Sequence, residues 1–325
     1  MESTASIPDP MSDARPCFIV LNAGSGQHDV RLTAGIIREV LGAAGRRHQL
    51  LLAERGRDLP HLARQAVELA KAEDGIVVAA GGDGTINAVA QAALGCGQPF
   101  AVLPQGTFNY FGRVHGISQD TRIATEALLA ATERPVQVGL INDRVFLVNA
   151  SLGLYPQLLE DREAFKKRFG RSRPVAIASG LLSFLRERRQ LVLDIEIEGE
   201  ARRIRTPTLF VGNNALQLTQ IGIAEAEALG RGRLVAIAMK PVGTASMIGL
   251  LLRGAFGRLG EADQVISFPL RSLTVRPPKR RRVRRYKVAM DGEVSRLAAP
   301  LVFQVSPEPL LLMVPPTPVV DGDPA

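Results

Sequence analysis

The sequence contains no tryptophan, and only 5% of its residues are aromatic. Proteins that bind single-stranded nucleic acids use aromatic side chains on which the bases stack, so this composition argues against such a function. The two cysteines, Cys17 and Cys96, lie far apart and suggest neither a disulfide framework nor a zinc site. Sparse cysteine is typical of a reducing compartment, and we therefore expect a cytoplasmic protein.

Other signatures are also missing. The histidines at positions 28, 48, 61 and 115 show no metal-ligand spacing. The polar first fifteen residues lack the apolar core of a signal peptide, and no run approaches the ~18 apolar residues of a membrane span. Two shorter apolar runs, 175–185 and 245–252, are expected to be buried helices. The alternative is that one of them rests on a bilayer.

The composition is otherwise that of a globular chain: 325 residues, 46% hydrophobic and 22% charged, which is long enough for two domains. A net charge of +8 favours an anionic partner. Seven of the nine residues in the run Lys279–Lys287 are cationic. We interpret this run either as the solvated face of a strand pair or as a patch for anionic lipid headgroups. No recognised motif supports binding to nucleic acid.

Predicted strands and helices alternate over the first part of the chain. This pattern predicts an α/β domain with a parallel sheet. The strands are expected at Cys17–Leu21, Gln49–Leu52, Ile76–Ala80 and Phe100–Leu103, and the helices at Leu32–Leu41, Leu59–Lys71, Ile86–Leu94 and Thr121–Ala131.

Near Pro135 the pattern changes to short strands, which predict a mainly antiparallel β-sandwich. The expected strands are Val136–Ile141, Val145–Ala150, Leu191–Glu198, Arg202–Val211, Leu234–Met239, Ser272–Arg276, Val283–Met290 and Val302–Val305. Long helices are expected only around Pro174–Arg189 and Thr244–Arg258.

Three glycine-containing loops follow the first, third and fourth predicted strands. Because the carboxyl ends of parallel strands meet at one edge of a sheet, we expect these loops to lie close together. Glycine lets a ligand approach the backbone amides, and a helix that begins in such a loop favours phosphate at its N-terminus. The loops are Asn22-Ala23-Gly24-Ser25-Gly26, Gly81-Gly82-Asp83-Gly84-Thr85 and Leu103-Pro104-Gln105-Gly106-Thr107-Phe108-Asn109.

This combination predicts a nucleotide-dependent phosphotransferase. The alternative for one loop alone is a plain strand-to-helix turn in which Asp83 only caps the helix. The loops match neither the Walker motif nor the dinucleotide fingerprint, and no Gly-x-Ser-x-Gly elbow is present.

A late acidic pair, Asp291-Gly292-Glu293, follows another predicted strand. A kinase needs a carboxylate that orients or deprotonates the attacking hydroxyl. The alternative is an ordinary Asp-Gly hairpin turn. The spacing does not decide between the two.

In this order along the chain, the three loops, Gly212-Asn213-Asn214 and the acidic pair resemble the motifs of the diacylglycerol kinase catalytic-domain family. That family includes bacterial lipid kinases and sphingosine kinases, and the resemblance spans roughly residues 16–315. It implies an α/β ATP-binding domain (1–138, with 302–325 returning to it) and a β-rich lipid-substrate domain (139–301). The implied activity is ATP-dependent phosphorylation of a hydroxyl on a diacylglycerol-like or sphingoid lipid, with Mg²⁺, at the inner face of a membrane.

The resemblance also implies roles for individual residues. Glu293 would accept the proton of the lipid hydroxyl, Asp291 would support it or bind the catalytic cation, and Asp83 would lie near the metal. The resemblance does not imply a complete set of metal ligands. The nucleotide would be bound by Asn22, Ala23, Gly24, Ser25, Gly26, Gly81, Gly82, Asp83, Gly84, Thr85, Ile86, Asn87, Gly106, Thr107 and Asn109.

Several positions depart from the family pattern. Ala23 replaces a proline, Ala53 a threonine and Tyr110 an acid. Arg231 stands where bacterial relatives carry an aspartate that helps to hold a structural magnesium ion, so we expect no such ion here.

These departures motivate an alternative, a weak or inactive family member that binds lipid or nucleotide as a regulator. A second alternative is an NAD kinase, since that class shares the Gly-Gly-Asp-Gly-Thr motif. The acceptor lipid and the oligomeric state, including a homo-oligomer, stay open.

Overall fold

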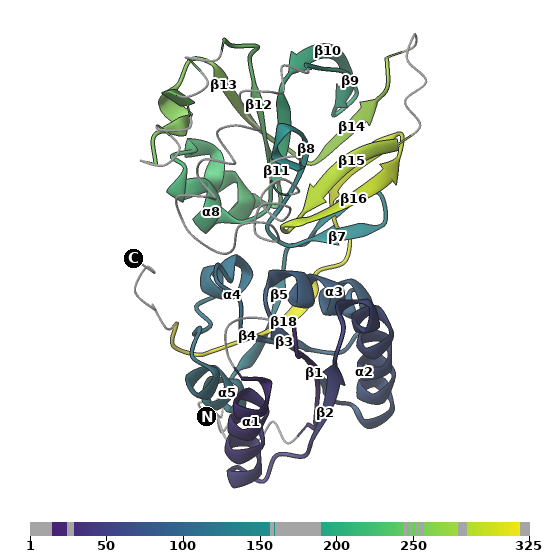
Figure 1. The fold of residues 1–325 in the computed structure, drawn as a ribbon, viewed down its shortest axis with the longest axis vertical. Helices are drawn as coiled ribbons and strands as arrows, with labels where there is room; N and C mark the ends of the chain where they lie inside the picture. The colour runs from purple at the N-terminus through teal and green to yellow at the C-terminus, as the bar shows by residue number, and fades with distance from the viewer. Residues whose placement is uncertain are drawn as a thin grey trace, which may run out of the picture. The chain divides into compact units, whose positions relative to one another are not determined.

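The computed structural model describes residues 15–24, 29–156, 190–243, 257–278 and 285–318, together with the single positions 159, 246, 249, 250 and 253. The chain divides into two compact units (Figure 1). Unit 1 comprises the residues up to Val136 and those from Glu308 onward, and unit 2 comprises Gln137–Pro307. We describe each unit by itself.

Unit 1 is built on a six-stranded sheet in the order β2-β1-β3-β4-β18-β5. All neighbouring strands are parallel except β5, which pairs antiparallel with β18. Every residue of β3 and β4 is buried, as expected for a parallel sheet covered on both faces. The strands are β1 (Cys17–Asn22), β2 (His48–Ala53), β3 (Ile76–Gly81), β4 (Phe100–Pro104), β5 (Thr132–Val136) and β18 (Leu310–Val314).

Helices cover both faces of this sheet. The helix α1 packs against α5, and α2 packs against α3, on opposite sides of the sheet (Figure 1). Asp29 and Asp120 cap α1 and α5 by accepting from the backbone N–H groups of Arg31 and Ile123. The helices are α1 (Val30–Ala43), α2 (Leu59–Glu73), α3 (Asp83–Ala93), α4 (Tyr110–Val114) and α5 (Thr121–Leu129), and the 3-10 turn η1 (Gly56–Asp58) precedes α2.

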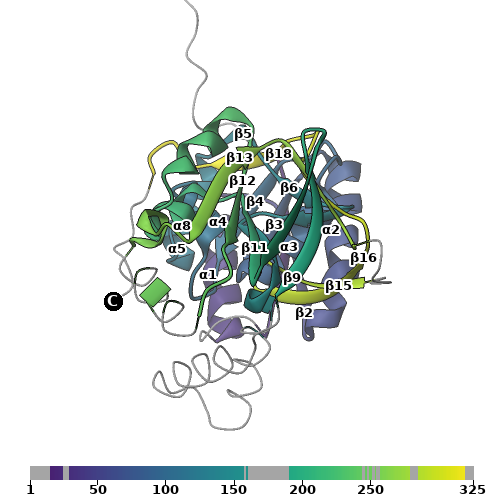
Figure 2. The same ribbon diagram turned by 90° about the horizontal axis from the view of Figure 1, so that it is seen from above.

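Unit 2 contains two six-stranded sheets, in the orders β10-β9-β14-β17-β6-β7 and β13-β12-β11-β8-β15-β16 (Figures 1 and 2). Their strand pairs are antiparallel. The strands are β6 (Gly139–Ile141), β7 (Arg144–Phe146), β8 (Asn149–Gly153), β9 (Leu191–Ile197), β10 (Glu200–Thr206), β11 (Thr208–Gly212), β12 (Leu234–Met239), β13 (Val265–Leu270), β14 (Ser272–Arg276), β15 (Arg285–Met290), β16 (Glu293–Ala298) and β17 (Leu301–Val305).

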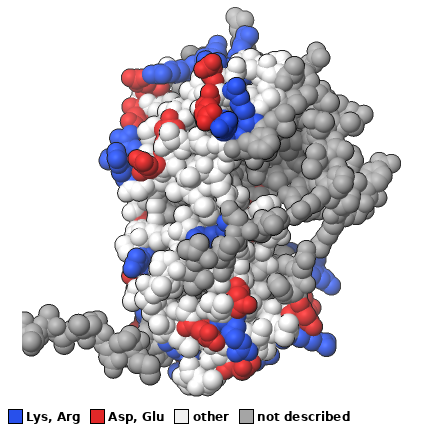
Figure 3. Space-filling view, turned by 90° about the vertical axis from the view of Figure 1, so that its left-hand side faces the viewer, with Lys and Arg blue, Asp and Glu red and all other residues white. Residues whose placement is uncertain are grey.

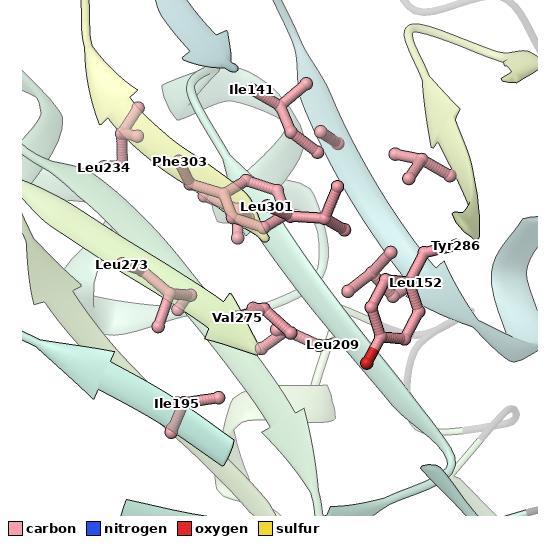
Figure 4. Close-up of a cluster of buried hydrophobic side chains, with 14 of the residues drawn as sticks. Ile141, Leu152, Ile195, Leu209, Leu234, Leu273, Val275, Tyr286, Leu301 and Phe303 are labelled. Atoms are coloured by element: carbon pink, nitrogen blue, oxygen red, sulfur yellow. The ribbon is translucent and has the colours of Figure 1, made fainter. Parts of the chain in front are cut away.

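One hydrophobic cluster joins the two sheets of unit 2. Figure 4 shows Ile195 and Val275 of one sheet in the same cluster as Leu152 and Leu209 of the other. Alternate residues of each strand enter this core, which is the packing of a β-sandwich. A second cluster packs the helix α8 (Ala215–Gln220) and the 3-10 segment η2 (Ala224–Arg231) on β12. The predicted combination of an α/β domain with an antiparallel sandwich is therefore confirmed.

Some boundaries differ from the expectation. The predicted strand Val136–Ile141 is two strands, and the units separate between them at Val136. The predicted strand Arg202–Val211 is broken at Pro207, and its two halves, β10 and β11, belong to different sheets. Proline lacks the backbone N–H that a continuous strand needs there.

The return to unit 1 begins later than expected. The strand β17 pairs with β14 and β6 of unit 2, so the return starts at Glu308 and not at Val302. The predicted helix Pro174–Arg189 lies outside the described residues, as does most of Thr244–Arg258. None of the helices that the structure describes is long and apolar enough to cross a bilayer.

Candidate active site

The first two glycine loops of unit 1 are joined by a side chain. Asn22, the last residue of β1, donates from Nδ2 to Thr85 Oγ1 at 2.8 Å. Its Oδ1 accepts from the N–H of Gly24 at 3.0 Å, which fixes the first residues of the loop. Ala23 donates its N–H to the carbonyl of Ala53 at 2.9 Å, so the alanine at position 53 keeps a backbone contact. Ser25 and Gly26 lie outside the described residues.

The second loop turns directly into α3. Gly82 is the N-cap and carries no capping side chain, so Asp83 lies in the first helical turn and is not the cap. A Cβ at Gly81 would come within 2.5 Å of Thr85 Cβ, so only glycine fits there. Thr85 and Ile86 are buried, whereas Gly82, Asp83, Gly84 and Asn87 are partly exposed.

The third loop touches the second. A Cβ at Gly106 would lie 2.9 Å from Gly82 Cα. Asn109 closes this loop: its Oδ1 accepts from Gly106 N–H at 2.8 Å, and its Nδ2 donates to Gly106 O at 2.8 Å and to Gln119 Oε1 at 3.1 Å. This closure leaves the tip, with Thr107, exposed. The three loops thus lie together at one edge of the sheet.

An aromatic pair flanks Asn109. Phe108 stacks on Tyr110 with ring centroids 5.8 Å apart and planes 3° from parallel. Phe108 is 46% exposed. Sequence reasoning noted Tyr110 only as a missing acid and did not foresee the stack. It included Gln105 in the third loop without predicting its role: Gln105 is buried and donates to Thr121 Oγ1 at 2.9 Å.

The acidic pair of unit 2 occupies a two-residue hairpin turn. Met290 pairs with Glu293, and the φ angles of Asp291 and Gly292 are 45° and 87°. The two interpretations of this pair, an ordinary hairpin turn and a site for the attacking hydroxyl, are therefore compatible. Glu293 is exposed, whereas Asp291 is only 8% exposed. The Asp291 carboxylate accepts backbone N–H bonds from Leu147 (2.7 Å), Val148 (2.9 Å) and Asn149 (3.0 Å).

A network of side-chain amides adjoins this turn. Asn213 donates from Nδ2 to Leu147 O at 3.1 Å and accepts from Gln137 Nε2 at 2.6 Å. Asn214 caps α8 through Gln217 N–H, and Gln217 Oε1 accepts from Asn149 Nδ2 at 3.0 Å. The Gly212-Asn213-Asn214 motif thus has a structural role. Sequence reasoning missed Gln137, Asn149 and Gln217, since no local pattern marks them.

Two buried polar atoms lie near the start of β8. Ala150 and Leu152 face the sandwich core, so Asn149 and Ser151 face the other side of their sheet. Asn149 Oδ1 and Ser151 Oγ are buried and have no hydrogen-bond partner within the part of the chain that the structure describes. Leaving such atoms unsatisfied is costly, so they suit a bound hydroxyl or a water molecule.

The arrangement of the acidic side chains limits metal binding among the described residues. Among the described residues, no group of three or more His, Cys, Asp or Glu side chains could hold an ion. Arg231 ends η2, and a guanidinium cannot ligate a metal. Gln137 Nε2 donates to Arg233 O at 3.0 Å and so holds this turn with an amide. Arg231 therefore supplies no ligand for a structural ion at this turn.

A phosphate-bound Mg²⁺ is a different case, because it needs only one or two carboxylates beside the phosphates. Asp83 supplies one carboxylate in the first turn of α3, the number of carboxylates that such an ion needs.

The basic run is described only at Arg285, Tyr286 and Lys287, and the residues 279–284 lie outside the described part. Tyr286 points into the sandwich core, and burial, with the charge of Asp194, raises its pKa. On the face seen in Figure 3, blue and red side chains are mixed.

Comparison with known proteins supports the resemblance. Residues 16–141 match the family model described as diacylglycerol kinase catalytic domain. A probable lipid kinase YegS-like of Pseudomonas aeruginosa is 36% identical over 131 residues, 40% of this chain and 41% of that protein. A diacylglycerol kinase of Bacillus subtilis is 36% identical over 107 residues, 32% of this chain and 34% of that protein.

The chain matches less than half the length of these curated relatives. A putative diacylglycerol kinase from Bacillus anthracis has a similar fold, with a TM-score of 0.69, 19% identity, and coverage of 93% of this chain and 98% of that chain. The resemblance to the diacylglycerol kinase catalytic-domain family is confirmed over residues 16–141, and the solved structure shows a similar fold.

Proposed function

We propose that the protein is an ATP-dependent lipid kinase that phosphorylates a hydroxyl of a diacylglycerol-like or sphingoid lipid. The observation that carries this proposal is the contact of the three loops of unit 1, through Asn22 with Thr85 and through Gly82 with Gly106. These loops fall within the residues that match the family.

The nucleotide side of the proposal rests on the start of α3. The first N–H groups of a helix have no intrahelical partner and carry partial positive charge, which favours phosphate. Gly82 and Gly84 leave these amides partly exposed, and Thr107 adds a hydroxyl from the exposed tip of the third loop. Asp83 would hold Mg²⁺ together with phosphate oxygens, and the bound ion would neutralise developing charge.

The acceptor side of the proposal rests on Glu293. In the transfer, a bond forms between the acceptor oxygen and the γ-phosphorus, and the bond from that phosphorus to the β,γ-bridging oxygen breaks, which releases ADP. The exposed carboxylate of Glu293 takes the proton of the hydroxyl. The buried polar atoms of Asn149 and Ser151 supply hydrogen bonds for polar groups of the lipid.

The test is transfer from labelled ATP to a panel of lipids in mixed vesicles, with NAD as a soluble acceptor. We expect labelled lipid from the wild type, and none from Asp83→Asn or Glu293→Gln with their folds intact. Full activity in both variants contradicts these roles, and label on NAD would support an NAD kinase. Varying the anionic lipid of the vesicles tests the membrane association proposed for Lys279–Lys287.

A second candidate function is a regulator that binds nucleotide or lipid with little turnover. Tyr110 favours it, because an aromatic side chain stands where the family carries an acid. ATP binding without transfer to any lipid would support this candidate over the enzyme.

A further inference from the structure

We infer that Asp291 is a positioning residue that clamps the start of β8 and thereby fixes Glu293 and Asn149, and that it does not itself accept the acceptor's proton. Only the catalytic part of this inference rests on the proposed function. The clamp itself is a property of the protein alone.

Four hydrogen bonds of Asp291 reach the segment 147–149. Its Oδ2 accepts from Leu147 N–H at 2.7 Å, and its Oδ1 accepts from Val148 and Asn149 N–H at 2.9 and 3.0 Å. Its own N–H donates to Asn149 O at 3.0 Å. Two carboxylate oxygens offer about four acceptor sites, so three of these are filled by the backbone. Charge-assisted bonds of this kind offset the burial of the carboxylate.

The clamped segment has few other ways to satisfy its backbone. Leu147 and Val148 are buried and lie between the ends of β7 and β8. Buried N–H groups outside a sheet ladder need a partner, and the Asp291 carboxylate supplies it. On the carbonyl side, Asn213 donates to Leu147 O at 3.1 Å and to Val148 O at 2.8 Å. The segment is therefore held from both sides.

The clamp sets the place of two residues with proposed roles. Glu293 follows Asp291 by two residues and pairs with Met290, so the anchored turn fixes where Glu293 leaves the sandwich. Asn149 is the last residue of the clamped segment, and its Oδ1 is one of the buried side-chain atoms without a hydrogen-bond partner among the described residues. Because Asp291 is 8% exposed and Glu293 is exposed, Glu293 is the carboxylate that a substrate can reach.

The substitution Asp291→Asn tests the clamp with little disturbance of the turn, since asparagine also tolerates φ near 45°. The amide keeps one oxygen but sets an NH₂ donor against the N–H of Leu147. We expect amide hydrogen exchange at Leu147 to quicken by roughly ten- to a hundredfold, the effect of losing a bond to a charged group. The matched control is Asp143→Asn in the turn between β6 and β7, whose side chain is exposed, and it should leave this exchange unchanged.

Exchange in the wild type keeps the inference testable if the variant does not fold. The amides of Leu147, Val148 and Asn149 should exchange far more slowly than that of exposed Gly292. Equal rates would overturn the clamp. Neither measurement needs ATP or lipid, so failure of the kinase proposal leaves this result readable.

The kinetic readout separates positioning from proton transfer. For Asp291→Asn we expect a raised KM for lipid and an acidic limb of the pH–kcat profile like that of the wild type. Glu293→Gln should instead show no turnover at any pH. Unchanged exchange at Leu147 together with lost turnover, or loss of the acidic limb in Asp291→Asn alone, would overturn the assignment.

Discussion

The contact between the second and third loops can be tested by adding one methyl group at Gly106. The Cβ of Gly106→Ala would lie 2.7 Å from Asn109 Oδ1 and 2.9 Å from Gly82 Cα. Carbon atoms in contact prefer ~3.5–4.0 Å, so the two loops must separate by about 0.6–1 Å. Gly106 has no positive φ, so the whole effect is steric.

Two magnitudes follow from this separation. Overpacking of this kind costs ~1–3 kcal/mol in the free energy of unfolding. Displacing a substrate-positioning group by 1 Å can cost about a hundredfold in rate, so we expect turnover to fall by that factor and ATP to bind more weakly. Urea denaturation and calorimetric titration with a non-hydrolysable ATP analogue measure the two effects.

The control is the same substitution at Gly35 in α1, where an added Cβ meets nothing within 4 Å. Alanine is a better helix former than glycine, so Gly35→Ala should raise the free energy of unfolding by ~0.5–1 kcal/mol and leave ATP binding unchanged. A folded Gly106→Ala protein that binds ATP and turns over like the wild type would refute the view that this loop contact builds the nucleotide site.

Two further predictions concern stability. Gln137→Ala removes the donors to Asn213 Oδ1 and Arg233 O, so it should lower the free energy of unfolding, measured in urea, by ~1–3 kcal/mol. Because an amide holds this turn, EDTA should leave the Tm of the wild type unchanged. A clear fall of the Tm with EDTA would contradict this view. Burial lowers the pKa of His115 from 6.5 to about 4, so protons bind preferentially to the unfolded chain. The contribution of the neutral His115 to stability is therefore complete above pH 6.5, and it is lost as the pH falls toward 4. His115→Phe should make the decline of Tm over that range shallower, and an unchanged slope would contradict this cause.

Local pattern predicted the strands β1, β3 and β4 of unit 1 well because they are short, almost fully buried runs, each followed by a loop that contains glycine. Once β1, β3 and β4 are parallel neighbours, their following loops must share an edge. Pattern could not predict how the loops are joined. The bond from Asn22 to Thr85 spans 63 positions, and nothing in either residue's neighbours marks the pair.

Unit 2 was less predictable for the same reason. The bond from Leu147 to Asp291 spans 144 positions, so the sequence indicated the acidic turn but not the backbone segment that Asp291 binds. The break at Pro207 could have been inferred from the missing N–H, since β10 and β11 join different sheets there. The short helix α4 was missed because five residues give too little periodicity.

Side-chain amides hold irregular backbone at several places in the described part of the chain. Asn22 and Asn109 fix the first and third loops of unit 1, and Asn213 fixes the start of β8 in unit 2. An amide can donate and accept at once, so one side chain satisfies both a backbone N–H and a backbone C=O, as Asn109 does for Gly106. A carboxylate only accepts hydrogen bonds, and an ammonium or guanidinium group only donates them, so none of these side chains satisfies both a backbone N–H and a backbone C=O. The loops beside the start of α3 are thereby held in place before a ligand binds, which is the condition under which fixed dipoles stabilise developing charge without reorganising.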